Sequence, residues 1–128
     1  PDRKKGISSG TYESTCEAQY VPYIYPQECG NHEDVRYVQL IGNRATIRFE
    51  SDDRMLSFKF LPYSDFEIEN ATHIEELPKS VSNHLTVCGF TRGVGGDDSW
   101  GSPVHTEFTL PVGEPYEFGL YIIPSILE

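Results

Sequence analysis

The chain has 128 residues, 38% of them hydrophobic and 23% charged, which suits one folded domain and excludes a disordered segment. Twenty Asp and Glu against ten Lys and Arg give a net charge of −10, which argues against nucleic-acid binding. No apolar run reaches the roughly 18 residues that a membrane-spanning helix needs, so no membrane partner is predicted.

Residues 1–10 are basic and small and predict a flexible lead-in to one domain over residues 11–128. The start, Pro1-Asp2-Arg3, has neither Met nor a hydrophobic signal region, which favours an internal segment and leaves the compartment open. The cysteines Cys16, Cys29 and Cys88 form no CxxC pair. Their spacing disfavours a zinc site, and free, incidental thiols are favoured over one disulfide.

Strand signals follow in chain order. Residues 19–25 are rich in aromatic and β-branched side chains, but Pro22 lies within them and Pro26 follows them. Because proline cannot donate a hydrogen bond to a neighbouring strand, this stretch predicts either an edge strand or an extended loop. Residues 35–41 predict a strand, Gly42-Asn43 a turn, and residues 45–49 a returning strand, which together make a β-hairpin.

Residues 56–60 alternate apolar and polar side chains and predict a strand. The capping-box pair Ser64 and Glu67 then predicts one short helix over residues 64–71. Further strands are predicted over residues 84–90, 107–110 and 116–123. Short strands separated by turns, with one short helix, predict an all-β fold of the β-sandwich class.

The glycine-rich loop over residues 92–104 ends on the only tryptophan, Trp100. An indole on a stiff loop can stack on the apolar face of a sugar ring, but lone tryptophans also fill sandwich cores, and composition alone favours the core. Asp97 and Asp98 lack the alternating acids of a calcium loop, so a turn is favoured over metal binding.

No catalytic residue is predicted from the remaining polar groups. The carboxylate pairs Glu67/Glu69 and Glu75/Glu76 surround the short polar helix, and a solvated helix face is favoured over the acid–base pair that a glycosidase needs. The histidines have no nearby nucleophile signature. His73 and His105 are expected to be buried and hydrogen-bonded.

Three segments in order resemble the family-2 glycoside hydrolase β-galactosidases of bacteria. They are residues 22–31 with Val35-Arg36 ("PYIYPQECGN…VR"), residues 60–77 ("FLPYS…ATH…EL"), and residues 93–108 ("GVGGDDSWG…H-EF"). The resemblance spans about Gly10 to Pro124. Cys29 stands where the family often has asparagine and His32 where it often has arginine, which leaves only local hydrogen bonding in doubt.

The resemblance implies a role without catalytic residues. The parent enzyme would remove terminal β-D-galactose residues with glutamates and Mg and Na ions in a TIM barrel outside this chain, which would hold no metal or cofactor itself. Trp100 would be the sugar-stacking residue, in place of the core position that composition favours. Gly95, Gly96, Asp97, Asp98 and Ser99 would shape its loop.

The resemblance also implies the architecture and the partners. The chain would be about half of a galactose-mutarotase-like supersandwich, inactive alone, with the barrel, the other sandwich half and the galactoside as partners. Cutting a sandwich exposes apolar surface, which predicts either a homo-oligomer, formed by dimerisation, or imperfect closure of the sheets. The compartment would be the bacterial cytoplasm or periplasm. The alternative is a free-standing carbohydrate-binding or structural β-sandwich module.

Overall fold

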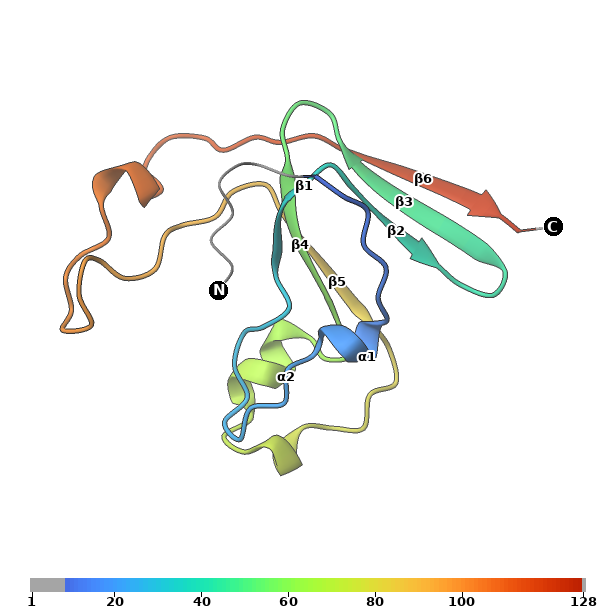
Figure 1. Ribbon diagram of the computed structural model, residues 1–128, viewed down its shortest axis with the longest axis horizontal. Helices are drawn as coiled ribbons and strands as arrows, with labels where there is room; N and C mark the ends of the chain where they lie inside the picture. The colour runs from blue at the N-terminus through green and yellow to red at the C-terminus, as the bar shows by residue number, and fades with distance from the viewer. Residues whose placement is uncertain (1–8, 128) are drawn as a thin grey trace.

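The computed structural model describes residues 9–127 and contains two three-stranded antiparallel sheets (Figure 1). One sheet has the order β1-β4-β5, with bounds His32–Val35, Leu56–Leu61 and His84–Cys88. The other has the order β2-β3-β6, with bounds Tyr37–Ile41, Ala45–Ser51 and Leu120–Ile126. The predicted all-β class is therefore confirmed. The predicted lead-in lies almost wholly outside the described residues.

Residues 9–127 contain four short helical segments, one before the first strand and three between later strands. They are α1 (Cys16–Gln19), α2 (Asp65–Asn70) and two 3₁₀ turns, η1 (Ile74–Glu76) and η2 (Thr106–Phe108). The predicted helix is confirmed as α2, because Ser64 and Glu67 form the reciprocal capping box. The second α-helix, α1, was not predicted, and the Thr15 hydroxyl caps it. No helix within residues 9–127 is long and apolar enough to cross a membrane.

The strand predicted over residues 35–41 is divided between the two sheets. Val35 ends β1, which pairs with β4, whereas Tyr37 begins β2, which pairs with β3. Asp34 adopts a positive φ of 56° where the β1–β4 register shifts, so the chain bends there and passes into the second sheet. The predicted hairpin of β2 and β3 is confirmed.

Of the two alternatives predicted for residues 19–25, the extended loop is confirmed over residues 20–25, while Gln19 ends α1. Two other predicted strands are corrected. Residues 107–110 do not form a strand, because the N–H groups of Phe108 and Thr109 donate to carbonyls three residues back and close the turn η2. The last strand begins at Leu120 instead of residue 116, and it continues through Pro124, which an edge strand tolerates.

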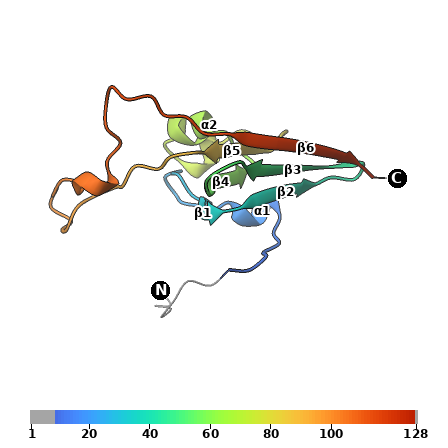
Figure 2. The ribbon, with the colours of Figure 1, turned by 90° about the horizontal axis from the view of Figure 1, so that it is seen from above.

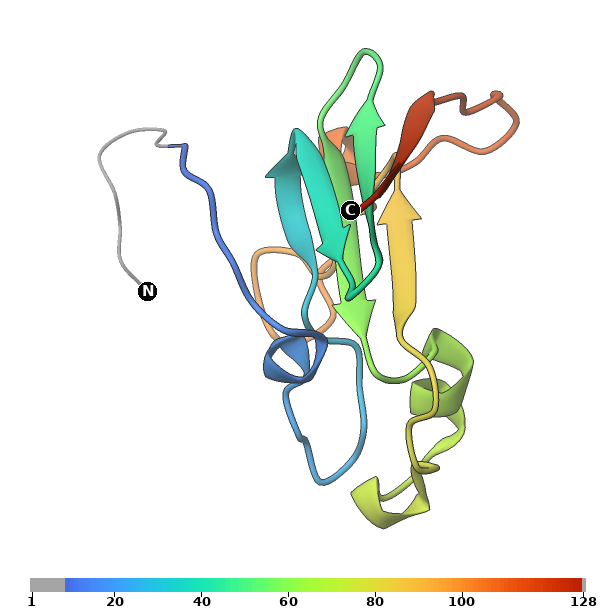
Figure 3. The same cartoon turned by 90° about the vertical axis from the view of Figure 1, so that its right-hand side faces the viewer.

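The buried core lies along β4, and α1 and α2 lie at the end of the sheet β1-β4-β5 where β4 finishes (Figures 1 and 3). Its apolar members are Cys16, Leu56, Leu61, Ile68 and Ala71. Both faces of β4 carry buried residues, because the polar residues Ser57 and Lys59 are buried as well. Ser57 donates to Asn31 Oδ1 at 3.2 Å, and Lys59 pairs with two carboxylates, so both buried polar groups have partners.

The sheet β2-β3-β6 contains no buried residue among those that the structure describes. Its cross-strand pairs place Val38, Phe49 and Ile122 in one row of one face, and Leu40, Ile47 and Pro124 in the next. Ile122 is 61% exposed and Ile126, on the same face, is 87% exposed. This apolar face, called the open face below, therefore has no cover within residues 9–127.

Candidate functional site

The segment from Gly89 to Gly119, called the arm below, links β5 to β6 and carries the predicted site. It extends away from both sheets and returns to them (Figures 1 and 2). The backbone N–H of Gly93 donates to the carbonyl of Phe108 at 2.7 Å, which closes the outer part of the arm into a loop. The arm contains η2 but no strand, as predicted for residues 92–104.

Trp100 lies at the surface of this loop. Its side chain is 93% exposed, so the core position that composition favours is wrong. The carboxylate of Asp98 accepts hydrogen bonds from the backbone N–H groups of Trp100 at 2.8 Å and Ser102 at 3.3 Å. These donors, Trp100 first, stabilise the charged carboxylate and lower the pKa of Asp98. The backbone beside the indole is therefore fixed while the indole itself faces solvent.

Glycines set the path of the loop around Trp100. Gly95 and Gly101 adopt positive φ angles of 78° and 102°, which disfavour any residue with a Cβ. A Cβ on Gly96 would lie 2.6 Å from the carbonyl oxygen of Ser102, so the two sides of the loop touch there. This geometry agrees with a shaping role for Gly95 and Gly96. Gly101 adds to it, and its position beside Trp100 is the signal that could have revealed it.

The other predicted loop residues, Asp97 and Ser99, lie between Gly96 and Ser102 in the chain. Asp97 Oδ1 is 2.8 Å from His105 Nε2, and Glu107 Oε1 is 3.9 Å from His105 Nδ1. Ser99 is exposed in the turn before Trp100. His105 is hydrogen-bonded as expected but not buried, since 48% of its side chain is exposed. His73 is also exposed, so the expected burial of both histidines is wrong.

Two of the carboxylates that were predicted to face solvent around α2 accept hydrogen bonds from residues nearby in the chain. Glu67 accepts from the backbone N–H and hydroxyl of Ser64 at 2.7 and 2.8 Å, and Glu76 accepts from the N–H of Thr72 at 2.8 Å. These bonds, the backbone ones first, lower the pKa of both carboxyls. A general acid needs a raised pKa, so neither group has the electrostatics for that role.

Lys59 is a site residue that the sequence pattern missed. Its Nζ lies 2.8 Å from Glu28 Oε1 and 2.7 Å from Asp65 Oδ1, although only 9% of the side chain is exposed. Tyr25, Gln27 and the two carboxylates line a cavity of about 500 Å³ above it. Burial opposes the charge on Lys59, but the hydrogen bonds to Asp65 and Glu28 outweigh it and raise the pKa of the ammonium.

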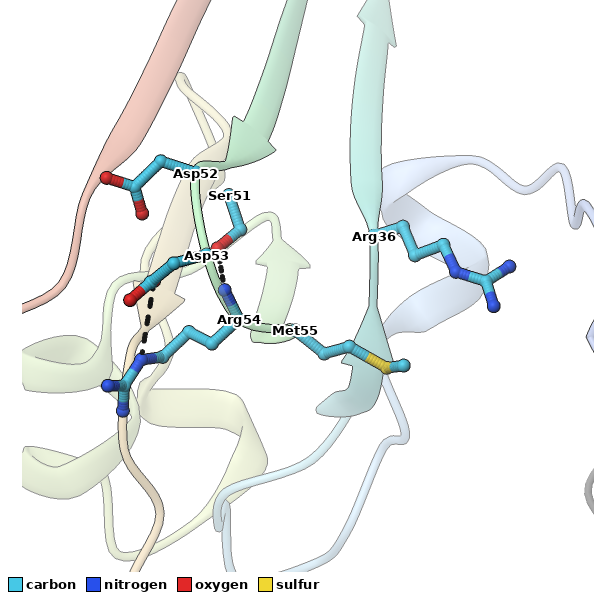
Figure 4. A pocket seen from close by; sticks show the side chains of 6 residues that line it. All are labelled: Arg36, Ser51, Asp52, Asp53, Arg54 and Met55. Carbon is cyan, nitrogen blue, oxygen red and sulfur yellow. Dashed lines mark hydrogen bonds and ion pairs between the residues drawn. The ribbon is translucent and has the colours of Figure 1, made fainter.

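A second hollow, of about 210 Å³, lies at the turn between β3 and β4. Figure 4 shows that its two arginines, Arg36 and Arg54, point away from each other on opposite sides. Arg54 is held by the Ser51 hydroxyl, which accepts from its backbone N–H at 3.1 Å, and by Asp53 at 3.6 Å. Because these side chains do not converge, the hollow has no common point for a ligand.

Within residues 9–127, no three His, Cys, Asp or Glu side chains lie close enough together to hold a metal ion. Cys16, Cys29 and Cys88 are free thiols, and Cys16 is buried against β4.

Comparisons with known proteins agree on one family. A family model described as "Beta galactosidase small chain" matches residues 1–122. A β-galactosidase of Streptococcus thermophilus is 37% identical over 96% of this chain, which spans 12% of that protein. A β-galactosidase of Lactobacillus delbrueckii subsp. bulgaricus is 37% identical over the whole chain and is likewise covered to 12%. The β-galactosidase small subunit of Latilactobacillus sakei is 35% identical over 92% of this chain, which covers 40% of it.

Proposed function

The chain belongs to the β-galactosidase small-chain family, and on that premise we propose that it forms part of a β-galactosidase. The enzyme removes terminal β-D-galactose residues, and this chain supplies a sugar-stacking tryptophan, Trp100, to an active site completed by other parts of the protein. The chain spans only 12% of the first relatives it matches, so the catalytic groups have ample chain outside it.

The exposure of Trp100 carries this proposal. A 93% exposed indole keeps a large apolar surface in water, which a sugar ring packed on its face would remove. The backbone N–H of Trp100 is bonded to Asp98, and Gly95 and Gly101 fix the turns on either side. An exposed aromatic side chain on a fixed backbone is suited to binding a ligand with little ordering cost.

The chain alone is expected to be inactive. Hydrolysis of a glycosidic bond needs two carboxyls on opposite sides of the bond, one of them protonated. Around α2, Glu67 and Glu76 are each bound to a neighbouring Ser or Thr that favours the charged form. In the arm, Asp98 is engaged by two backbone N–H groups. These carboxylates hold the backbone in place and leave catalysis to residues outside the chain.

The open face supports a partner within the same enzyme. The face is apolar in each described row, and an isolated domain would leave it in water. The small-subunit relative has further chain beyond the matched region, since this chain covers 40% of it. We propose that the other half of the β-sandwich, from the same enzyme, covers the open face. An uncovered apolar face also argues against a free-standing module.

The test uses the complete β-galactosidase that contains this chain. Replacing Trp100 with Ala is expected to raise KM for a β-galactoside at least about tenfold, because the stacking surface is lost. Trp100→Phe keeps a ring and is expected to retain most of the affinity. Val112→Ala, at another fully exposed position of the arm, is the matched control and should leave KM unchanged. An unchanged KM and kcat in Trp100→Ala would overturn the proposal.

A further inference from the structure

The two ends of the arm meet at Gly89 and Phe118. A Cβ on Gly89 would overlap the ring of Phe118, so the ring lies directly on the glycine backbone. Gly119 is in similarly close contact with the Asp52 carboxylate, in the turn that precedes β4. Figure 4 shows Asp52 beside the segment that leads into β6. The backbone at each end of the arm is therefore in close contact with a side chain, Phe118 at Gly89 and Asp52 at Gly119.

Phe90 joins this contact from the other side. Its ring meets Tyr116 edge to face at a centroid distance of 5.0 Å and Phe118 at 6.4 Å. The Arg54 guanidinium lies 4.4 Å above the Phe90 ring, which suits a cation–π interaction. Tyr116 also donates its hydroxyl hydrogen to the carbonyl of Pro111 at 2.6 Å. The group Arg54, Gly89, Phe90, Tyr116 and Phe118 is called the clasp below.

The rest of the arm has no comparable anchor. No side chain of the arm is buried, so no core packing fixes its direction. The bonds within it, such as that between Gly93 and Phe108, fix its shape but not its position relative to the sheets. The position of Trp100 in space therefore depends on the angle at which the arm leaves the clasp.

We propose that Gly89, Phe90 and Phe118 are positioning residues for Trp100. They act through the backbone of the arm and do not touch the sugar, and the proposal rests on the proposed function of Trp100. A displacement of about 1 Å at a binding group can cost up to about 100-fold in activity. A small change at the clasp is therefore expected to displace Trp100 and to weaken its contact with the sugar.

The test is a pair of substitutions in the complete enzyme. Gly89→Ala places a methyl group against the Phe118 ring and is expected to raise KM at least about fivefold with a smaller effect on kcat. Phe118→Ala removes the ring, so the double variant Gly89→Ala/Phe118→Ala should be no worse than Phe118→Ala alone. Gly42→Ala, in the β2–β3 hairpin, is the matched glycine control and should leave KM unchanged. Additive losses in the double variant would overturn the proposal.

A second readout separates this proposal from that of the sugar site. The distance between spin labels at Val94, in the arm, and Phe66, in α2, which are both exposed, should change in Gly89→Ala and not in Gly42→Ala. If Trp100→Ala has no kinetic effect while this distance changes, the clasp is supported and the sugar role fails. If Trp100→Ala raises KM while Gly89→Ala changes neither KM nor the distance, the sugar role is supported and the clasp is overturned.

Discussion

Asp98 fixes the backbone of Trp100 through a single carboxylate oxygen. Its Oδ1 accepts the N–H of Trp100 at 2.8 Å and the N–H of Ser102 at 3.3 Å. Because the two donors lie on either side of Gly101, whose φ is 102°, one oxygen holds the whole turn. Asp98 therefore fixes the backbone of this turn by hydrogen bonds, in an arm where no buried residue fixes it by packing.

This contact predicts a pH dependence of loop order. The pKa of Asp98 is lowered below its ordinary value of about 3.9, because the bonds from Trp100 and Ser102 stabilise the charged form. The stabilisation is therefore fully present above about pH 4 and is lost as the pH falls through the lowered pKa. Hydrogen–deuterium exchange of residues 93–104 should rise only below about pH 4.

Two variants of Asp98 serve as controls for that experiment. Asp98→Ala removes the acceptor, so the exchange of residues 93–104 should be fast at every pH. Asp98→Asn keeps one acceptor oxygen without the charge, and its exchange should be intermediate and independent of pH in the acidic range. The same acid dependence in Asp98→Asn as in the wild type would contradict the assignment to this carboxylate.

Much of the fold could be predicted from local pattern. The hairpin of β2 and β3 follows from alternation on both sides of Gly42-Asn43, and α2 follows from the pair Ser64 and Glu67. The buried polar face of β4 could not be predicted, because burial of Lys59 depends on Glu28 and Asp65, which are distant or on another element. Tertiary partners decided which face of the strand is inside.

The arm shows a second limit of local pattern. Residues 107–110 alternate like a strand, yet no neighbouring strand pairs with them, and local bonds close η2 instead. The start of β6 is delayed to Leu120 because Tyr116 and Phe118 are used in the clasp. The exposed position of Trp100 followed from the family resemblance and not from composition, which favours burial of a lone tryptophan.

The two ion pairs of the buried Lys59 predict a non-additive loss of stability. Glu28→Gln and Asp65→Asn should each cost about 1 kcal/mol or less, since both carboxylates are more than half exposed and the ammonium keeps one partner. The double variant leaves a 9% exposed ammonium without a carboxylate and should cost clearly more than the sum. Urea unfolding of all three variants measures the difference.

The two ion pairs of Lys59 also predict how the stability of the fold changes at alkaline pH. Because the pKa of Lys59 is raised, its stabilisation is fully present below its ordinary pKa and is lost as the pH rises through the raised value. Glu69→Gln alters a carboxylate of the same cavity that pairs with no lysine within residues 9–127, so it should change stability little. Strict additivity of Glu28→Gln and Asp65→Asn would contradict a shared role at Lys59.

The open face predicts self-association of the isolated chain. Ile122 is 61% exposed on the apolar face and pairs with Phe49, whereas Ile123 points to the opposite face and pairs with Arg48. Sedimentation should show dimers or larger species for the isolated chain, and Ile122→Asp should shift them toward monomer. The neighbouring Ile123→Asp is the control. An equal effect of both substitutions, or a monomeric wild type, would argue against the open face as a docking surface.

The most direct test of the central claim observes Trp100 itself while sugar binds. The complete enzyme is labelled with 5-fluorotryptophan, and the resonance of Trp100 is assigned by its loss in Trp100→Phe. A β-galactoside with a sulfur-linked aglycone, which resists hydrolysis, is then titrated in. We predict that the Trp100 resonance shifts with the same midpoint as inhibition of hydrolysis. A Trp100 resonance that stays fixed while hydrolysis is fully inhibited would contradict the claim that this chain supplies the sugar-stacking residue.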